Sequence, residues 1–334
     1  MIHPRQAWCI QISTTELCWP KTPAGQLTSC SNCTRGIAHI AKRHIMSLDE
    51  IERSLQCLAS FPLESDPCPQ GRRKVIGCFG AEPLLHPQFP EVVDLFVKYI
   101  PNVWNRGLWT SLNWKTYEHP RYGVAKPHVE RIVGRKPNGT VWERQRDRYG
   151  EGGYLNWNMH SEKQTCHHSS VLVGIQEVIA DENQRYEMIS KCPYQRDWSP
   201  LVGPDADGDI RFWFCEVAQT HSRIFGLNNG IPLSPDCWKG DIDFFRSEDG
   251  QLFPAGLYAE QIIQNCNRCS GALPVPGRRD LDFSDDISPA NATALLDRGS
   301  PQVRRRDHEL FDIGVYQSEN PQNDGNPLRY IKSK

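Results

Sequence analysis

Short, mostly apolar runs recur along the first third of the chain at the length of β-strands. Residues 7–13 and residues 74–79 each form such a run, and a third run over residues 108–113 ends in polar side chains. Apolar runs of this length, bounded by polar and turn-forming residues, are typical of buried strands. The pattern therefore predicts three strands in this part of the chain.

Amphipathic helices are predicted between these strands. Ser47 and Glu50 form a capping box, in which each side chain accepts a hydrogen bond from a backbone amide at the start of a helix. Apolar residues then follow at helical spacing, and residues 88–100 repeat that spacing after the second strand. The alternation favours a parallel sheet, wound right-handedly and closed fully or partly into a barrel. Functional residues of such folds lie at the carboxyl ends of the strands.

The middle of the chain interrupts this alternation. Residues 115–165 are polar and rich in Arg, Tyr and Gly, which predicts an insertion, either a lid or a solvated loop. An Asn-Gly pair within residues 132–142 is typical of a tight hairpin turn. The alternation resumes with a predicted strand over residues 170–175 and a helix near residues 181–191. We therefore assign residues 1–190 to the barrel.

The last part of the chain is first rich in cysteine and then rich in charged and polar residues. A predicted turn and strand end at Cys215, and Cys266 and Cys269 form a C-x2-C pair at the end of a predicted helix. Residues 191–276 are therefore predicted to form a small cysteine-rich domain. Residues 277–334 show little apolar periodicity, which predicts an irregular tail.

Charge and composition narrow the possible functions. The 334 residues include 38 basic and 40 acidic ones, and this near balance gives no overall field that would attract nucleic acid or an anionic membrane. No apolar run approaches the ~18 residues of a membrane span, and the first residues do not resemble a signal peptide. We therefore expect a soluble, cytoplasmic protein. Thirteen cysteines in a reducing compartment indicate metal or cluster ligation wherever they are clustered.

Three cysteines near the start of the chain, Cys18, Cys30 and Cys33, follow the first predicted strand. Three thiolates can bind three irons of a [4Fe–4S] cube and leave the fourth iron open for a small ligand, whereas an electron-carrying cluster uses four. For Cys30 and Cys33 alone, the C-x2-C spacing also fits half of a zinc site. The three cysteines thus indicate a catalytic cluster, with structural zinc as the alternative.

Together with the turn after the second strand, these cysteines resemble the motifs of the radical S-adenosylmethionine (SAM) superfamily. Members carry a cysteine triad after the first barrel strand, most often C-x3-C-x2-C, and a Gly-Gly-Glu-Pro-like turn after the second. Residues 14–18 match the approach to the triad, and residues 29–36 match its last two cysteines. Residues 80–87 match the turn, with Ala81 in place of the second glycine. Eleven residues separate the first two cysteines here, so a loop-like insertion lengthens the triad.

The resemblance implies a partial (β/α)6 TIM-like barrel that binds SAM and a [4Fe–4S] cluster with one open iron. In the superfamily, an electron from the cluster cleaves SAM to a 5′-deoxyadenosyl radical, which removes hydrogen from the substrate. A reductant such as flavodoxin or ferredoxin supplies that electron. Glu82 would accept a hydrogen bond from the methionine ammonium. The residues that the resemblance places at SAM are Gly80, Ala81, Glu82, Pro83, Thr110, Ser111 and Asn113.

The later cysteines resemble the SPASM or twitch extensions that hold auxiliary iron–sulfur clusters in many radical SAM enzymes. The turn and strand before Cys215 are the best match. The resemblance implies one auxiliary [4Fe–4S] cluster, whose expected ligands are Cys192, Cys215, Cys266 and Cys269. Cys237 is the alternative to Cys192, and a structural zinc is the alternative to the cluster.

Two functions from different classes follow from these patterns. The first is a radical SAM enzyme that acts on an unidentified peptide or protein, carbohydrate or small metabolite. The second is a non-catalytic binding module, stabilised by zinc through Cys30, Cys33, Cys266 and Cys269. Iron and sulfide in anaerobically purified protein would distinguish the enzyme from the zinc module.

Overall fold

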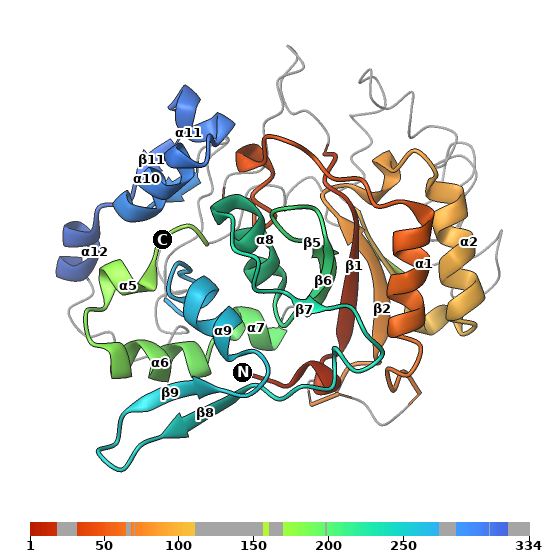
Figure 1. Cartoon of the computed structure of the whole chain (residues 1–334), viewed down its shortest axis with the longest axis horizontal. Coiled ribbons are helices and arrows are strands. Elements are labelled where there is room, and N and C mark those ends of the chain that lie inside the picture. The colour runs from red at the N-terminus through yellow and green to blue at the C-terminus, as the bar shows by residue number, and fades with distance from the viewer. Residues whose placement is uncertain are drawn as a thin grey trace.

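The computed structural model is built around one large mixed sheet (Figure 1). The residues that it describes are 1–18, 32–64, 68–69, 71–110, 156–159, 170–197, 199–273, 285–306 and 308–319. None of the helices within these residues is long and apolar enough to span a membrane.

The sheet has the strand order β4–β3–β2–β1–β5–β6–β7. The strands from β4 to β5 are parallel to their neighbours, and β6 and β7 extend the sheet in antiparallel fashion. The bounds are β1 Cys9–Thr15, β2 Val75–Gly80, β3 Arg106–Thr110, β4 Asn156–Met159, β5 Leu201–Pro204, β6 Ile210–Trp213 and β7 Ile231–Pro232. A mixed α/β fold with a mostly parallel sheet is therefore confirmed, and β4 and β7 are the edges of this sheet among the described strands.

Two amphipathic helices, α1 (Leu48–Cys57) and α2 (Phe89–Tyr99), lie on one side of β1 and β2 (Figure 1). Both were predicted from the sequence and both are confirmed. The capping box is present: Ser47 Oγ accepts from the Glu50 amide at 3.2 Å, and Glu50 Oε2 accepts from the Ser47 amide at 2.7 Å. The apolar sides of these helices share one core with side chains on one face of β1 and β2, such as Ile10. Burial of this apolar surface fixes which side of the sheet the two helices cover.

The opposite side of the same strands carries an indole ring laid against glycine. A Cβ atom added at Gly77 or at Gly107 would lie 2.0 or 2.2 Å from the Trp109 ring. Glycine is therefore required at both positions, because any side chain would displace the ring. Trp109, Cys9 and Val75 form a second, smaller apolar cluster here.

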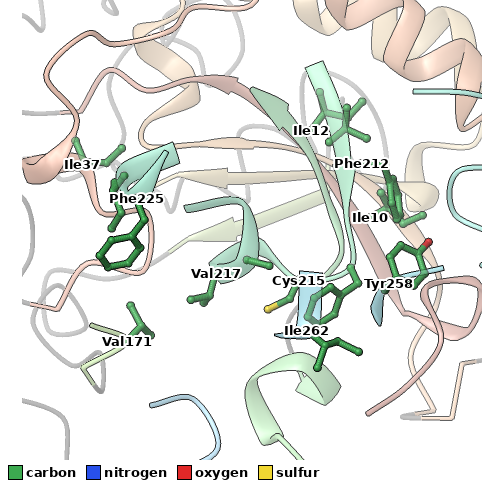
Figure 2. Packing of buried hydrophobic residues seen from close by; sticks show 14 of the residues in the cluster. Ile10, Ile12, Ile37, Val171, Phe212, Cys215, Val217, Phe225, Tyr258 and Ile262 are labelled. Carbon is green, nitrogen blue, oxygen red and sulfur yellow. The ribbon is translucent and has the colours of Figure 1, made fainter. Parts of the chain in front are cut away.

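The remaining described residues form helices on the other side of β1, opposite α1 (Figure 1), and two small two-stranded sheets. Figure 2 shows part of the core, where Phe212 and Tyr258 lie near Ile10 and Ile262 lies near Cys215. The helices of this part are α5 Ile175–Val178, α6 Glu182–Ser190, α7 Pro193–Asp197, α8 Glu216–Phe225, α9 Ala259–Gln261 and the π-helix η7 Ile262–Cys266. The short 3-10 helices are η1 Pro4–Gln6, η2 Ile37–His39, η3 Pro83–Leu85 and η4 Val103–Asn105. A hairpin of β8 Asp243–Arg246 and β9 Leu252–Ala255 stands apart from the main sheet.

The predicted strand over residues 170–175 is wrong. Leu172 makes only an isolated bridge to Ile287, and Ile175 begins α5. The apolar run is buried all the same, because it packs against later parts of the chain. The helix predicted near residues 181–191 is confirmed as α6.

The sequence also failed to predict the regular structure near the carboxyl terminus. Residues 285–319 contain two parallel strands and three helices in place of an irregular tail. Their bounds are β10 Asp285–Ile287, α10 Pro289–Asp297, α11 Pro301–Arg305, β11 His308–Leu310 and α12 Ile313–Glu319. Of the predicted insertion over residues 115–165, β4 is described and completes an edge of the sheet, and the hairpin predicted within residues 132–142 lies outside the described residues.

Candidate functional site

The turn after β2 is joined directly to the segment after β1. The two strands pair in parallel from Cys9 with Val75 to Thr15 with Gly80, so their carboxyl ends coincide. Past the strands, the Ala81 amide donates to Thr15 O at 2.9 Å. Two motifs that are far apart in the sequence thus meet at one edge of the sheet.

The next residue continues this connection. The Glu82 amide donates to Leu17 O at 2.9 Å, which places Glu82 in contact with the residue before Cys18. Gly80 makes the approach possible, since it has a φ of 146° and an added Cβ would lie 2.3 Å from Thr15 O. The glycine is therefore needed for contact between the two segments of the chain itself.

Glu82 is completely buried at this turn. Its side chain caps η3, with Oε1 accepting from the Leu84 amide at 3.3 Å, and Pro83 is the first residue of that helix. Proline suits this position because its fixed φ matches a helical start and its missing amide has no partner there. The carboxylate is thus held in a fixed place beside the segment that leads to Cys18.

The remaining residues expected at this site are described only in part. Cys18 and Cys33 are half-buried cysteines that pack against the main core. Thr110 is the last residue of β3, and its side chain is not among those described. Cys30, Ser111 and Asn113 lie outside the described residues.

A buried arginine that the sequence analysis missed follows Cys33 by two residues. Arg35 Nη2 donates to Ser13 Oγ of β1 at 2.9 Å, and Nη1 lies 3.3 Å from both Glu216 O and Thr220 Oγ1 of α8. Burial lowers the pKa of its guanidinium, and the negative charge of Glu216 opposes that shift. Arg35 therefore fixes the segment after Cys33 to both β1 and α8.

Glu216, the first residue of α8, belongs to the same network as Arg35. Burial raises the pKa of its carboxyl to about 7, while the charge of Arg35 and side-chain hydrogen bonds with Thr34 and Gln11 act in the opposite direction. Glu216 directly follows Cys215, and Thr34 directly follows Cys33. The network therefore joins Thr34 and Arg35, which follow Cys33, to Glu216, which follows Cys215.

Four cysteines that were predicted to act together line a single pocket. We call it the four-cysteine pocket, and its lining includes Cys192, Cys215, Cys266 and Cys269. They come from four places in the fold: Cys192 lies between α6 and α7, Cys215 is the N-cap of α8, Cys266 ends η7, and Cys269 follows shortly after. Figure 2 shows Cys215 within the apolar core. A π-helical turn is a common feature of functional sites, because its extra residue redirects the side chains that follow.

All four thiols are hard to ionise. Burial raises the pKa of each of them, that of Cys269 to about 12. The charges of the other cysteines add to the effect: Cys192 and Cys269 both raise the pKa of Cys215. These groups are therefore neutral thiols at pH 7 unless a cation enters the pocket and stabilises their thiolates.

The described residues contain no group of three or more His, Cys, Asp or Glu side chains arranged to hold a metal ion. The four thiols thus border a common pocket without converging on a single ion position. Cys237, the alternative to Cys192, lies elsewhere: its pKa is raised to about 11 by burial, and its neighbouring thiol is Cys57.

A histidine that was not predicted also lines the four-cysteine pocket. His221 Nδ1 lies 3.1 Å from Asn265 O, and Nε2 lies 2.9 Å from Val171 O. Burial lowers the pKa of this imidazole to about 4, so it is neutral at pH 7. The sequence signal for His221 is its position on an otherwise apolar side of α8. The same signal also fits an ordinary buried histidine.

Comparison with known proteins gives no relative: no family model matches the chain, and the curated proteins and the solved structures contain no significant match.

Proposed function

We propose that the protein is a radical SAM enzyme whose catalytic [4Fe–4S] cluster is bound by Cys18, Cys30 and Cys33. The observation that carries the proposal is the pair of hydrogen bonds from the Ala81 and Glu82 amides to Thr15 O and Leu17 O. They join the glutamate turn to the approach to Cys18 at the carboxyl ends of two parallel strands. Parallel α/β folds use that edge for their functional residues.

The finer fold that we propose is a partial (β/α)6 barrel, followed by a cysteine-rich extension over residues 191–276. The parallel strands β1 to β4 would form the described part of the barrel wall, and β5 of the extension pairs with β1 in the same sheet. Trp109, lying over Gly77 and Gly107, would line the inside of that wall.

The residues at the first site fit the groups that the proposal requires. Thiolates are soft ligands suited to iron–sulfur clusters, and three of them leave one iron open. When bound, the cluster supplies the electron for reductive cleavage of SAM. Glu82 would bind the SAM ammonium, because a completely buried carboxylate gains most from a cationic hydrogen-bond donor. The flanking residues Thr110, Ser111 and Asn113 remain candidates for the carboxylate and ribose hydroxyls of SAM.

The four-cysteine pocket would hold an auxiliary [4Fe–4S] cluster. Four sulfur atoms border it, and four is the number that a fully ligated cluster needs. We expect a reductant such as flavodoxin or ferredoxin. A peptide or protein, a carbohydrate and a small metabolite all remain possible substrates.

The test is SAM cleavage in anaerobically reconstituted protein reduced with dithionite, with 5′-deoxyadenosine measured by chromatography. We expect the wild-type protein to release it and the Cys18→Ala/Cys30→Ala/Cys33→Ala variant to release none, with a loss of about four iron atoms per chain. Cys57→Ala, at a half-buried cysteine outside both groups, is the matched control and should retain iron and activity.

The single variant Cys18→Ala tests the lengthened spacing of the triad. Loss of cleavage supports Cys18 as a ligand. Full iron content and cleavage in this variant would instead assign the third position to another cysteine, such as Cys9.

The competing function is a zinc-stabilised binding module. Soft thiolate sets also suit zinc, which this module would bind through Cys30, Cys33, Cys266 and Cys269, but the described thiols do not converge on a single ion position. Colourless protein with one zinc per chain and no sulfide would support this module and contradict the enzyme.

A further inference from the structure

Residues 32–39, which include Cys33, are attached to β10 through Asn32. Asn32 Nδ2 donates to Asp286 Oδ2 at 3.0 Å, and the Asp286 amide donates to Asn32 Oδ1 at 2.9 Å. The two residues that this reciprocal pair joins are 254 positions apart in the sequence. Asn32 has a φ of 51°, a left-handed conformation that asparagine tolerates better than most residues.

The same segment is attached to β10 again at its other end. His39 Nε2 lies 2.9 Å from Asp285 Oδ2, and Nδ1 lies 2.8 Å from Ser300 Oγ. A carboxylate oxygen only accepts, so Nε2 donates to Asp285, and Nδ1 and Ser300 Oγ share the second hydrogen bond. The three residues are at most 4% exposed.

Serine, histidine and aspartate in this order also make up the catalytic triad of many hydrolases. Here the serine has another role, because Ser300 Oγ accepts from the Val303 amide at 3.3 Å and caps α11. Complete burial keeps a substrate from the hydroxyl. The arrangement is suited to fixing two parts of the chain together.

Cys33 lies between these two attachments on a short, tightly bonded path. The Gly36 amide donates to Cys33 O at 2.8 Å, and the His39 amide donates to Gly36 O at 2.9 Å. Because two successive turns connect them, a displacement of His39 is expected to shift Cys33 as well.

We propose that β10 positions Cys33 for cluster binding, through Asp285 on His39 and Asp286 on Asn32. The carboxyl-terminal residues 285–306 are then part of the first cysteine site, and Asp285, Asp286, His39 and Ser300 are positioning residues. The inference rests on the proposed function in one respect, since it takes Cys33 as a cluster ligand. Partners behind the ligands of a metal site commonly fix ligand orientation, and their loss lowers metal affinity.

The test combines two measurements on the full chain. The first is the rate at which iodoacetamide labels individual cysteines in the iron-free protein, followed by mass spectrometry. The second is iron content after anaerobic reconstitution in a Cys266→Ala/Cys269→Ala background, so that iron reports on the first site. Asp285→Ala removes the attachment at His39. Asn32→Gly removes the attachment at Asp286 while keeping a residue that accepts a positive φ.

We expect Asp285→Ala to raise the labelling rate of Cys33 at least about tenfold relative to that of Cys78, because it leaves a buried histidine without its acceptor. Asn32→Gly should raise it a few-fold. Both should lower the iron bound at the first site and change the line shape of its electron paramagnetic resonance spectrum. Val93→Ala, in the core beside α2, is the control for general loss of stability and should leave the Cys33 rate unchanged.

Unchanged Cys33 labelling and unchanged iron in both variants would overturn the positioning role. An equal rise in Val93→Ala would also overturn it, since the effect would then be global. The proposed function fails separately, when the parent protein with its first site intact binds no iron, and the labelling measurement does not depend on that result.

Discussion

The two groups of cysteines are assembled in different ways. In the first, Cys18 follows β1, and backbone hydrogen bonds join the residues before it to the Glu82 turn after the parallel strand β2. The second gathers four side chains from the ends of α6, α8 and η7 and from the loop after η7, and tertiary packing alone brings them to one pocket. The first site is thus organised by sheet register and the second by the core.

This difference decides how each site should respond to mutation. Changes to the turn after β2 should disturb the first site while the four-cysteine pocket keeps its shape. Loss of the pocket cysteines should spare the first site. The Arg35–Glu216 network connects the neighbours of both groups, so removing one group of cysteines tests whether the other is independent of it.

The largest expected effect is at the four-cysteine pocket. Cys266→Ala/Cys269→Ala should remove about one cluster of iron and sulfide, because two thiols cannot hold it, while SAM still alters the signal of the remaining cluster. Elemental analysis and electron paramagnetic resonance measure both. Unchanged iron with a loss of zinc would make the pocket a structural zinc site.

The turn of the first site should be the most sensitive backbone position. Gly80→Ala should lower the free energy of unfolding by about 4 kcal/mol, because it adds a strained φ to a clash with Thr15 O. Gly71→Ala is the matched control: Gly71 also has a positive φ, but an added Cβ meets no atom of the described residues within 4 Å. Urea denaturation should show a loss of only about 1 kcal/mol there. Equal losses in the two variants would contradict the tight contact between the strands' ends.

The elements that bring the first site together were predictable from sequence because they depend on local patterns. Ser47 and Glu50 mark the start of α1, and apolar residues at helical spacing mark α2. The strands that end near Cys18 and Glu82 are apolar runs of the right length. The sequence also grouped the four cysteines of the pocket, and the structure brings them to one place.

The sequence could not predict the parts that depend on distant contacts. The run near Leu172 looks like a strand because it is apolar, yet its burial comes from packing against residues beyond 285. The carboxyl-terminal elements look irregular because polar residues such as Asp285 and Ser300 are buried there by specific partners. Arg35 and Glu216 are separated by 181 positions, and no local pattern connects them.

The pH dependence of stability should be traceable to His221. Burial lowers its folded pKa from 6.5 to about 4, so below pH ~6.5 the unfolded chain binds a proton that the folded chain does not. Stability should therefore fall as the pH falls. Between pH 7 and pH 5 the iron-free wild-type protein should lose about 2 kcal/mol more than His221→Gln does. Denaturant titrations at the two pH values measure the difference, and parallel losses would show that His221 is not buried in this way.

The central claim is that the Glu82 turn and the cysteines after β1 form one SAM site. Glu82→Gln tests it, because glutamine keeps an oxygen for the Leu84 amide and removes only the negative charge. The cluster should still assemble, and SAM should bind about tenfold or more weakly, which corresponds to the ~1.5–3 kcal/mol of a charged hydrogen bond. The measurement is a SAM titration followed by the electron paramagnetic resonance signal of the reduced cluster. The account predicts a shifted titration in Glu82→Gln, and identical titrations in the two proteins, or a wild-type signal that SAM does not change, would contradict it.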